Sequence, residues 1–325
     1  MFLVPGLEKK PHSYDEYHST LEPKYQDMAR DELREEDYTR GPALAQLREF
    51  IAKHPQIQRC RTDPLFLLRF LRSKKFNVVA ACDMLEKFLI AGELYPDFFT
   101  KIDPLGMKHL VEQGIIVPIE QDRAGRLVII LRMGQFDPET VTPEEECRLT
   151  TLLIETYMDT EIYQITGIVL VFDLRDTKMA HFSMWTYPKL KMIMTAMDEI
   201  LAFRIKEIHI VQLPKYAAMI ADFCIAALSS KLRQRLKFHK SLEEFKDAID
   251  ETILPTIYGG KLSLEEANER FLKRTLEERD RILKHTEMFI DLSIPNPNSK
   301  NSNAGLHSNL ADESVIGSFR KLNVD

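Results

Sequence analysis

The sequence predicts an α/β fold that follows a helical N-terminal region, and two observations lead to this class. The first hundred residues are highly charged and carry their apolar residues at helical spacing. From about residue 115, short runs rich in Val and Ile alternate with helical stretches, an order that implies parallel strands joined by right-handed crossovers. We therefore expect a helical domain over residues 1–100, an α/β domain over 101–262, a helix over 263–290 and a mobile tail over 291–325.

The N-terminal region is expected to consist of several helices. "EPKYQDMARDELREED" mixes charges of both signs with few large apolar residues, as a solvated helix does. "DPLFLLRFLRSKKF" has a helical pattern, with Asp63 as an N-cap and Pro64 at the first helical position. "NVVAACDMLEKFLIAGELY" continues with apolar residues at intervals of three and four, so the region predicts a small helical domain.

Four short apolar segments are predicted to be buried strands: "IIVPI", "RLVIIL", "GIVLVFDL" and "IKEIHIVQL". The second and third flank a helical stretch in which Thr142 can cap, Pro143 fits the first turn and Glu145 completes a capping box. A further helical stretch, "TYPKLKMIMTAMDEIL", separates the third and fourth segments. This alternation is the main reason to expect a parallel sheet.

The end of the α/β domain is marked by a capped helix and a short closing sequence. Ser241 and Glu244 form the capping box of "SLEEFKDAI", and "LPTIYGG" follows it. The segment over 263–290 is amphipathic and is predicted to be one long helix. From residue 291 the composition turns to Asn, Ser and Pro, which is typical of a mobile tail.

Composition excludes several classes of protein. The chain has 325 residues and a net charge of -6, which argues against wholesale nucleic-acid binding. Its 4 cysteines lie far apart, without the spacing of a metal site, and fit reduced thiols in a cytoplasmic protein. The N-terminus does not resemble a signal peptide, and no apolar run reaches the ~20 residues of a membrane span. We expect no metal and no cofactor.

Catalysis finds little support in the sequence. The motifs G-x-G-x-x-G, G-x-S-x-G and H-E-x-x-H and the P-loop are absent. The strongest candidate is Asp173, at the end of a predicted strand and followed by Asp176, but phosphatases that use an aspartyl nucleophile have their acids two apart. An Asp that binds local backbone explains this position better. His209, within "EIHIV", is expected to be a core histidine. We therefore expect a protein that is not an enzyme.

The segment 214–230, "PKYAAMIADFCIAALSS", is apolar almost all round a helix and is interrupted only by Lys215 and Asp222. Such a helix must be buried or must face lipid, and this one is too short to span a bilayer. One interpretation is a core helix of the α/β domain. The other is a helix that covers an apolar site and meets a membrane surface.

A basic run follows this segment, in an otherwise acidic chain. Its cations alternate with Leu and Gln and are Lys231, Arg233, Arg235 and Lys237. In a strand, Arg235 and Lys237 share a face with His239, whereas in a helix Lys231 and Arg235 stack one turn apart. Arg204 and Lys206 form a second pair on one face of a predicted strand. Together these cations could bind a phosphate headgroup, although a solvated charged surface is the alternative.

Two motifs resemble the CRAL-TRIO lipid-transfer family. "DPLFLLRFLRSKKFNVVAA" is similar to its helical N-terminal signature, here about residues 45–95, and "LPTIYGG" to its closing motif. The resemblance covers roughly residues 45–290 and points to the animal branch that includes alpha-tocopherol transfer protein, retinaldehyde-binding protein and the clavesins. It implies a helical N-terminal domain followed by a lipid-binding domain. That domain would have a mixed, mainly parallel sheet, one hydrophobic cavity and a mobile lid helix, here residues 214–230.

The resemblance also implies site residues. The cavity wall would comprise Thr150, Thr151, Ile154, Ile168, Phe172, Ile193, Ala196, Met197, Leu201, Phe203, Ile205 and Ile208. The lid would present Tyr216, Met219, Ile220 and Phe223 as a membrane-facing or cavity-closing stripe. Phosphoinositide would bind at Arg204, Lys206, Lys231, Arg233 and Arg235. Ile154 stands where tocopherol transfer protein has a Ser and Thr177 where it has a Trp, so the ligand need not be tocopherol.

Two functions follow from this resemblance. The first is a cytoplasmic, monomeric carrier of a retinoid, tocopherol or other isoprenoid-like lipid, peripheral on membranes that contain phosphoinositide. The second is a phosphoinositide-binding trafficking adaptor whose cavity holds phospholipid or nothing. Both involve a membrane surface, and neither involves nucleic acid.

Overall fold

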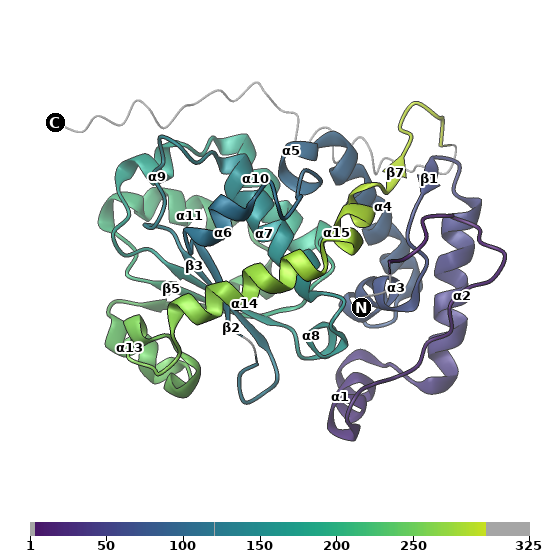
Figure 1. The fold of residues 1–325 in the computed structure, drawn as a ribbon, viewed down its shortest axis with the longest axis horizontal. Coiled ribbons are helices and arrows are strands. Elements are labelled where there is room, and N and C mark those ends of the chain that lie inside the picture. Colours follow the sequence, from purple (N-terminus) through teal and green to yellow (C-terminus); the bar gives the residue numbers. More distant parts are fainter. Residues whose placement is uncertain (1–3, 120, 297–325) are drawn as a thin grey trace.

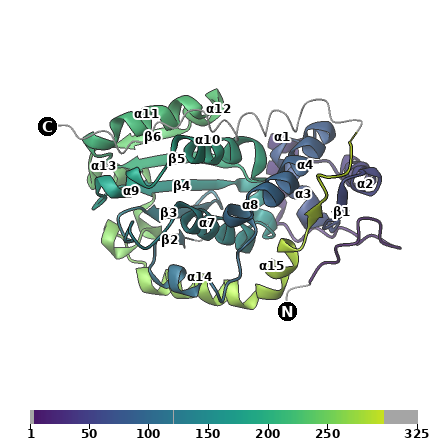
Figure 2. The ribbon, with the colours of Figure 1, turned by 90° about the horizontal axis from the view of Figure 1, so that it is seen from above.

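The computed structural model of the protein describes residues 4–119 and 121–296. A sheet with its covering helices forms one end of the molecule, and the N-terminal helices gather at the other end (Figure 1). Seen from above, the strands β2 to β6 lie side by side, and helices α1 to α4 lie together away from them (Figure 2). The bounds of the N-terminal helices are α1 Pro23–Leu33, α2 Asp37–Lys53, α3 Pro64–Ser73, α4 Val78–Leu94 and α5 Pro96–Phe99.

Helix α3 begins as the sequence predicts, and its arginines join the two ends of the molecule. Asp63 accepts a hydrogen bond from the Phe66 amide, 3.2 Å away, and Pro64 occupies the first turn. Two of its arginines are buried and ion-paired with distant acids, Arg72 with Glu161 at 2.6 Å and Arg69 with Asp159, also at 2.6 Å. The "LRFLR" part of the N-terminal signature therefore holds the helical region against the α/β domain.

The sheet has five strands in the order β2-β3-β4-β5-β6. Their bounds are β2 Ile116–Ile119, β3 Leu127–Arg132, β4 Ile168–Asp173, β5 Ile205–Val211 and β6 Leu236–His239. β2 is antiparallel to β3, and the other neighbouring strands are parallel. This confirms the predicted α/β class with a mixed, mainly parallel sheet.

Helices connect the parallel strands. The helical segments between and around them are α6 Lys108–Glu112, α7 Pro143–Tyr157, α8 Glu161–Thr166, α9 Met179–Ser183, α10 Tyr187–Thr195, a π-helical turn Ala196–Ile200, a 3-10 turn Lys215–Ala217, α11 Ala218–Ala227, α12 Ser230–Arg233 and α13 Leu242–Ala248. The capping box predicted for α7 is present, since Thr142 and Glu145 bond each other's backbone amides. The basic run is part helix and part strand, because α12 ends at Arg233 and β6 begins at Leu236.

The two faces of the sheet pack against different partners. Alternate residues of β3 and β4, such as Ile129 and Leu170, join one apolar cluster with α7 and α14 (Leu264–Glu277). The residues between them, such as Val128 and Val169, join another cluster with Phe245 of α13. This alternation follows from the period of two in a strand. Both faces are therefore covered, as the continuous Val and Ile runs predict.

The closing motif "LPTIYGG" fixes the end of strand β4. Tyr258 is fully buried, and its hydroxyl donates to the Asp173 carboxylate at 2.6 Å. Arg175 donates to the same carboxylate, also at 2.6 Å. Burial alone would raise the pKa of Asp173, but the hydrogen bonds from Arg175 and Tyr258 lower it. Gly259 follows with φ of 84°, a conformation that favours glycine. Asp173 is thus part of the contact between β4 and the closing motif.

The C-terminal segment differs from the single helix predicted over 263–290. It forms α14, then α15 (Arg279–Thr286), with a break at Glu278, whose buried carboxylate accepts from Arg274 and Arg281. A short strand, β7 Phe289–Ile290, then pairs antiparallel with β1 Ile57–Arg59 in the N-terminal region. Of the predicted tail, residues 297–325 lie outside the described residues. Among those described, no helix is both long and apolar enough to cross a membrane.

Candidate functional site

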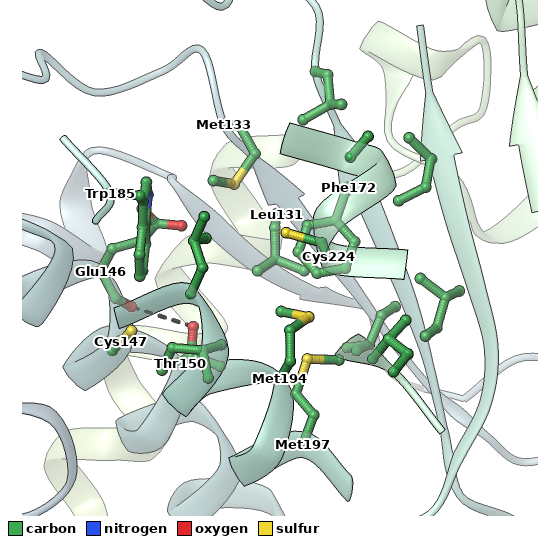
Figure 3. Close-up of a pocket in the computed structure, with 18 of the residues that line it drawn as sticks. Leu131, Met133, Glu146, Cys147, Thr150, Phe172, Trp185, Met194, Met197 and Cys224 are labelled. Carbon is green, nitrogen blue, oxygen red and sulfur yellow. Dashed lines mark hydrogen bonds between the residues drawn. The ribbon is translucent and has the colours of Figure 1, made fainter. Parts of the chain in front are cut away.

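An apolar cavity of about 270 Å³ lies between the sheet and its helices. Its floor is the face of β3, β4 and β5 that carries Leu131, Phe172 and Ile208, and its walls come from α7 and α10. Helix α11 covers it through Ile220 and Cys224. Figure 3 shows Leu131, Phe172, Met194, Met197 and Cys224 around the empty space, with Glu146 and Trp185 at one side.

The hydroxyl groups in the wall are bonded to the protein itself. Thr150 donates to the main-chain oxygen of Glu146 at 3.2 Å, the contact drawn in Figure 3. Thr151 donates to the main-chain oxygen of Cys147 at 3.0 Å, and Thr177 to that of Leu174 at 2.7 Å. The hydrogen atoms of these hydroxyls are therefore already used, and the wall is almost entirely apolar toward the cavity.

Glu146 is different from these groups. Its side chain is buried in the cavity wall, and its Oε2 atom has no hydrogen-bond partner within the described residues. Burial raises the pKa of this carboxyl to about 8. Glu146 does not stand out in the sequence, because Glu144, Glu145 and Glu146 together resemble the acidic first turn of a helix, where negative charge interacts favourably with the helix dipole.

The predicted wall residues line this cavity with one exception. Ile205 is buried in the same apolar cluster, opposite Ile168, but does not line the cavity. It is the first residue of β5, beside an irregularity in the pairing with β4, and packs into the surrounding core. That the others contact a ligand stays a prediction.

The lid segment, residues 214–230, covers the cavity with a different stripe from the predicted one. Ile220, Cys224 and Leu228 line the cavity at intervals of four, as one face of a helix does. Phe223 instead packs on Tyr187, with ring centroids 4.3 Å apart. Phe223 therefore does not line the cavity beside Ile220, because α10 lies beside α11 and contacts this side chain. That the predicted stripe faces a membrane stays a prediction.

Tyr216 and Met219 also lie away from the cavity. The Tyr216 hydroxyl donates to the main-chain oxygen of Thr177 at 2.5 Å, and its ring contacts Phe182 edge-on. Met219 is 65% exposed. The start of this segment thus contacts the segment between β4 and β5, and its outer side presents Met219 to the surroundings.

Arg204, Lys206, Lys231 and Arg235 form a basic cluster beside the C-terminal end of the lid. Burial lowers the pKa of Lys231, and the nearby charges of Arg235 and Arg204 act in the same direction. The pKa of Lys206 is lowered by burial and by the charges of Arg204 and Arg235, against the effect of its hydrogen bond with Glu32. Two segments distant in sequence therefore bring four cations together, as the sequence analysis expected.

Two further residues belong to this cluster and were missed. Lys74, directly after α3, is close enough for its charge to lower the pKa of Lys231. Glu32 of α1 accepts from Arg204 at 2.8 Å and from Lys206 at 2.6 Å. Both come from the N-terminal helices, and nothing in their local sequence links them to residues more than 150 positions away.

Arg233 and the strand residues of the basic run have other surroundings. Arg233 is exposed, and in the described part of the chain its side chain makes no ion pair or hydrogen bond. Lys237 pairs with Glu207 at 2.7 Å. Glu207 also contacts His209, whose other ring nitrogen lies 2.9 Å from His239. Burial lowers the pKa of His209 to about 4, so it is a neutral core histidine, as expected.

Comparison with known proteins finds a domain match and several similar chains. Residues 111–260 match the model of the CRAL/TRIO domain. Clavesin-1 of Xenopus laevis is 28% identical over 249 residues, which cover 75% of each chain. Alpha-tocopherol transfer protein-like of Homo sapiens is 27% identical over 237 residues, 71% of this chain and 68% of that one. The solved structure "Crystal structure of Sfh5" has 9% identity and a TM-score of 0.45, covering 75% of this chain and 99% of its own, and supports no conclusion. Residues 111–260 thus match a CRAL/TRIO domain, and most of the chain is similar to proteins named clavesin and alpha-tocopherol transfer protein-like.

Proposed function

We propose that this protein binds one small hydrophobic molecule in its cavity and carries it between membranes, without catalysing a reaction. The apolar cavity beneath the lid carries the proposal, because such a space suits a molecule that is poorly soluble in water. Relatives named for tocopherol transfer support a lipid cargo. The cargo would be a retinoid, a tocopherol or another isoprenoid-like lipid.

Affinity for such a cargo would come from burial. Each Å² of apolar surface removed from water contributes about 25 cal/mol, before the costs of association are subtracted. The wall offers few free hydrogen-bonding groups, since its threonines are bonded to the backbone. Most of the binding free energy would therefore be hydrophobic, and the few polar contacts would select among cargoes.

Release would be coupled to a membrane that contains phosphoinositide. The basic cluster would bind the headgroup, because several cations around one phosphate make charge-assisted hydrogen bonds. Lys231 lies only four residues after α11 ends at Ala227, so an anion bound there would act next to the lid. In the open form the apolar face of the lid would contact lipid and would stay out of water. A membrane would therefore shift the population toward the open form. The protein would act as a monomer in the cytoplasm and peripherally on membranes.

The cargo is tested by mass spectrometry of an organic extract of the purified native protein. We expect one isoprenoid-like or similarly hydrophobic molecule in roughly equal amount to the protein. An extract that contains only phospholipid, or no lipid at all, would favour the alternative of a trafficking adaptor.

Membrane coupling is tested with Lys231→Ala combined with Arg235→Ala. Without these two cations we expect binding to vesicles that contain phosphoinositide to fall at least tenfold, and cargo transfer to those vesicles to slow. The matched control is Lys240→Ala with Lys261→Ala, which removes the same charge from two exposed lysines outside the cluster. Equal losses in both double variants would show that total charge, and not this cluster, governs binding. Arg233→Ala tests the remaining predicted cation.

A further inference from the structure

The side chain of Glu146 is an unpaired polar group at the edge of an apolar cavity. The residue is only 6% exposed, and it lines the cavity together with Cys147 and Thr150 from the same helix. Its acidic neighbours have partners: Glu144 pairs with Lys189 at 2.6 Å, and Glu145 completes the capping box of α7. Among the described residues, no cation pairs with Glu146 and no donor reaches its Oε2 atom.

The other polar groups of the wall do not share this property. Thr150, Thr151 and Thr177 donate their hydroxyl hydrogens to main-chain oxygens, and the His181 ring contacts the Phe136 oxygen at 3.0 Å. Of the described cavity-lining residues, Glu146 alone has a buried side-chain atom without a partner. Thr150 has only lone pairs left to offer. Among the buried side-chain atoms of this wall, the free hydrogen-bonding capacity therefore rests with Glu146.

An unpaired buried polar group destabilises a protein by about 1–3 kcal/mol, so native structures contain few of them. Replacement by a Leu of similar size would remove that cost. Glu146 also has its pKa raised to about 8 by burial, so that near neutral pH it is mostly protonated. In this form it has an O–H that donates and a carbonyl oxygen that accepts.

We propose that Glu146 binds the polar end of the cargo, and that the cargo is a lipid alcohol. This inference rests on the proposed function. A hydroxyl both donates and accepts, so one alcohol satisfies both halves of a neutral carboxyl. A carbonyl satisfies only the donor, and a hydrocarbon satisfies neither. Since the surrounding wall is apolar, the rest of the cargo lies along Leu131, Phe172 and Met197, and its hydroxyl lies toward α7 (Figure 3).

The test measures affinities for matched probes. One pair is a fifteen-carbon isoprenoid alcohol and the hydrocarbon of the same skeleton, and the other is a sixteen-carbon fatty alcohol and hexadecane. We expect the native protein to bind each alcohol at least tenfold more tightly than its hydrocarbon. Glu146→Leu should remove this preference and leave hydrocarbon binding equal or tighter. Glu146→Gln, whose amide also donates and accepts, should retain most of it.

Controls separate a binding role from a structural one. Glu139→Leu makes the same replacement at an exposed loop position and should leave the preference unchanged. Ligand-free Glu146→Leu should melt at a higher temperature than the native protein, because a buried unpaired group is gone. A side chain needed only for folding would give the opposite shift.

The outcomes distinguish this inference from the proposed function. If the native protein binds alcohol and hydrocarbon equally, or if Glu146→Leu keeps the preference, the inference is wrong while the carrier function stands. A native protein that prefers the sixteen-carbon amine over the alcohol at neutral pH would also overturn it, since an amine calls for a charged carboxylate. If none of the probes binds, the carrier function itself fails.

Discussion

Glu146 should make the stability of the protein depend on pH. Its pKa is raised by burial from 4.5 to about 8, so between these values the folded chain holds a proton that the unfolded chain has lost. A group of this kind contributes stability below pH 4.5, and the contribution is lost as pH rises toward 8. The loss is at most about 1.4 kcal/mol per pH unit.

Denaturant unfolding of the native protein and of Glu146→Gln, from pH 4 to pH 9, measures this effect. We expect the free energy of unfolding of the native protein to fall relative to that of the variant up to about pH 8. Above that pH the two curves of free energy against pH should run parallel. The neighbouring groups Glu144, Cys147, His181 and Lys189 are present in both proteins. Two curves that run parallel over the whole range would mean that Glu146 is not buried from solvent.

At the scale of elements, helix α1 places an acid inside the basic cluster. Glu32 accepts from Arg204 and Lys206 in the position where a phosphate oxygen would lie. Burial alone would raise the pKa of Glu32, but the hydrogen bonds from Lys206 and Arg204 lower it, so this carboxylate is charged at neutral pH. An anion that bound Arg204 and Lys206 would have to displace Glu32.

We therefore expect Glu32→Gln to strengthen binding to vesicles with phosphoinositide by several fold, measured by co-sedimentation. Asp31→Asn is the matched control, because it removes one negative charge from an exposed neighbour on the same helix. If the two variants bind alike, then Glu32 acts only through net charge. Weaker binding of Glu32→Gln would mean that this acid orients the cluster and does not compete with the headgroup.

How far each element could be predicted depends on the range of the forces that shape it. The strands and the starts of α3 and α7 depend on local features, Val and Ile runs and caps such as Asp63 and Thr142, and these predictions are confirmed. The break at Glu278 and the orientation of Phe223 depend on neighbouring helices, and no periodicity reveals them. The basic cluster was predicted from two segments, but Glu32 and Lys74 enter it through tertiary packing alone.

At the scale of the whole molecule, the N-terminal helices are joined to the α/β domain by buried ion pairs. Arg72 is fully buried and donates to Glu35 at 2.8 Å and to Glu161 at 2.6 Å. Arg72→Met would leave these acids buried without their main partner, and we expect it to lower the free energy of unfolding by about 3–5 kcal/mol.

Urea unfolding checks this expectation against Arg270→Met, a change at an exposed position of α14 that should stay within about 0.5 kcal/mol. A loss of less than about 1 kcal/mol in Arg72→Met would mean that the buried acids take up protons or find water. In that event the helical region would be joined to the rest mainly by apolar packing.

The pairing of β1 with β7 has a consequence for the order in which the protein is made. Ile57 lies opposite Ile290, which is fully buried in the apolar cluster of the N-terminal helices. A ribosome adds about 5–20 residues per second, so Ile290 is added roughly ten to fifty seconds after Ile57. The core of the helices around Ile57 is therefore completed only after Ile290 has been made. Until then, a chaperone would find the unpaired edge of β1 and its apolar neighbours exposed.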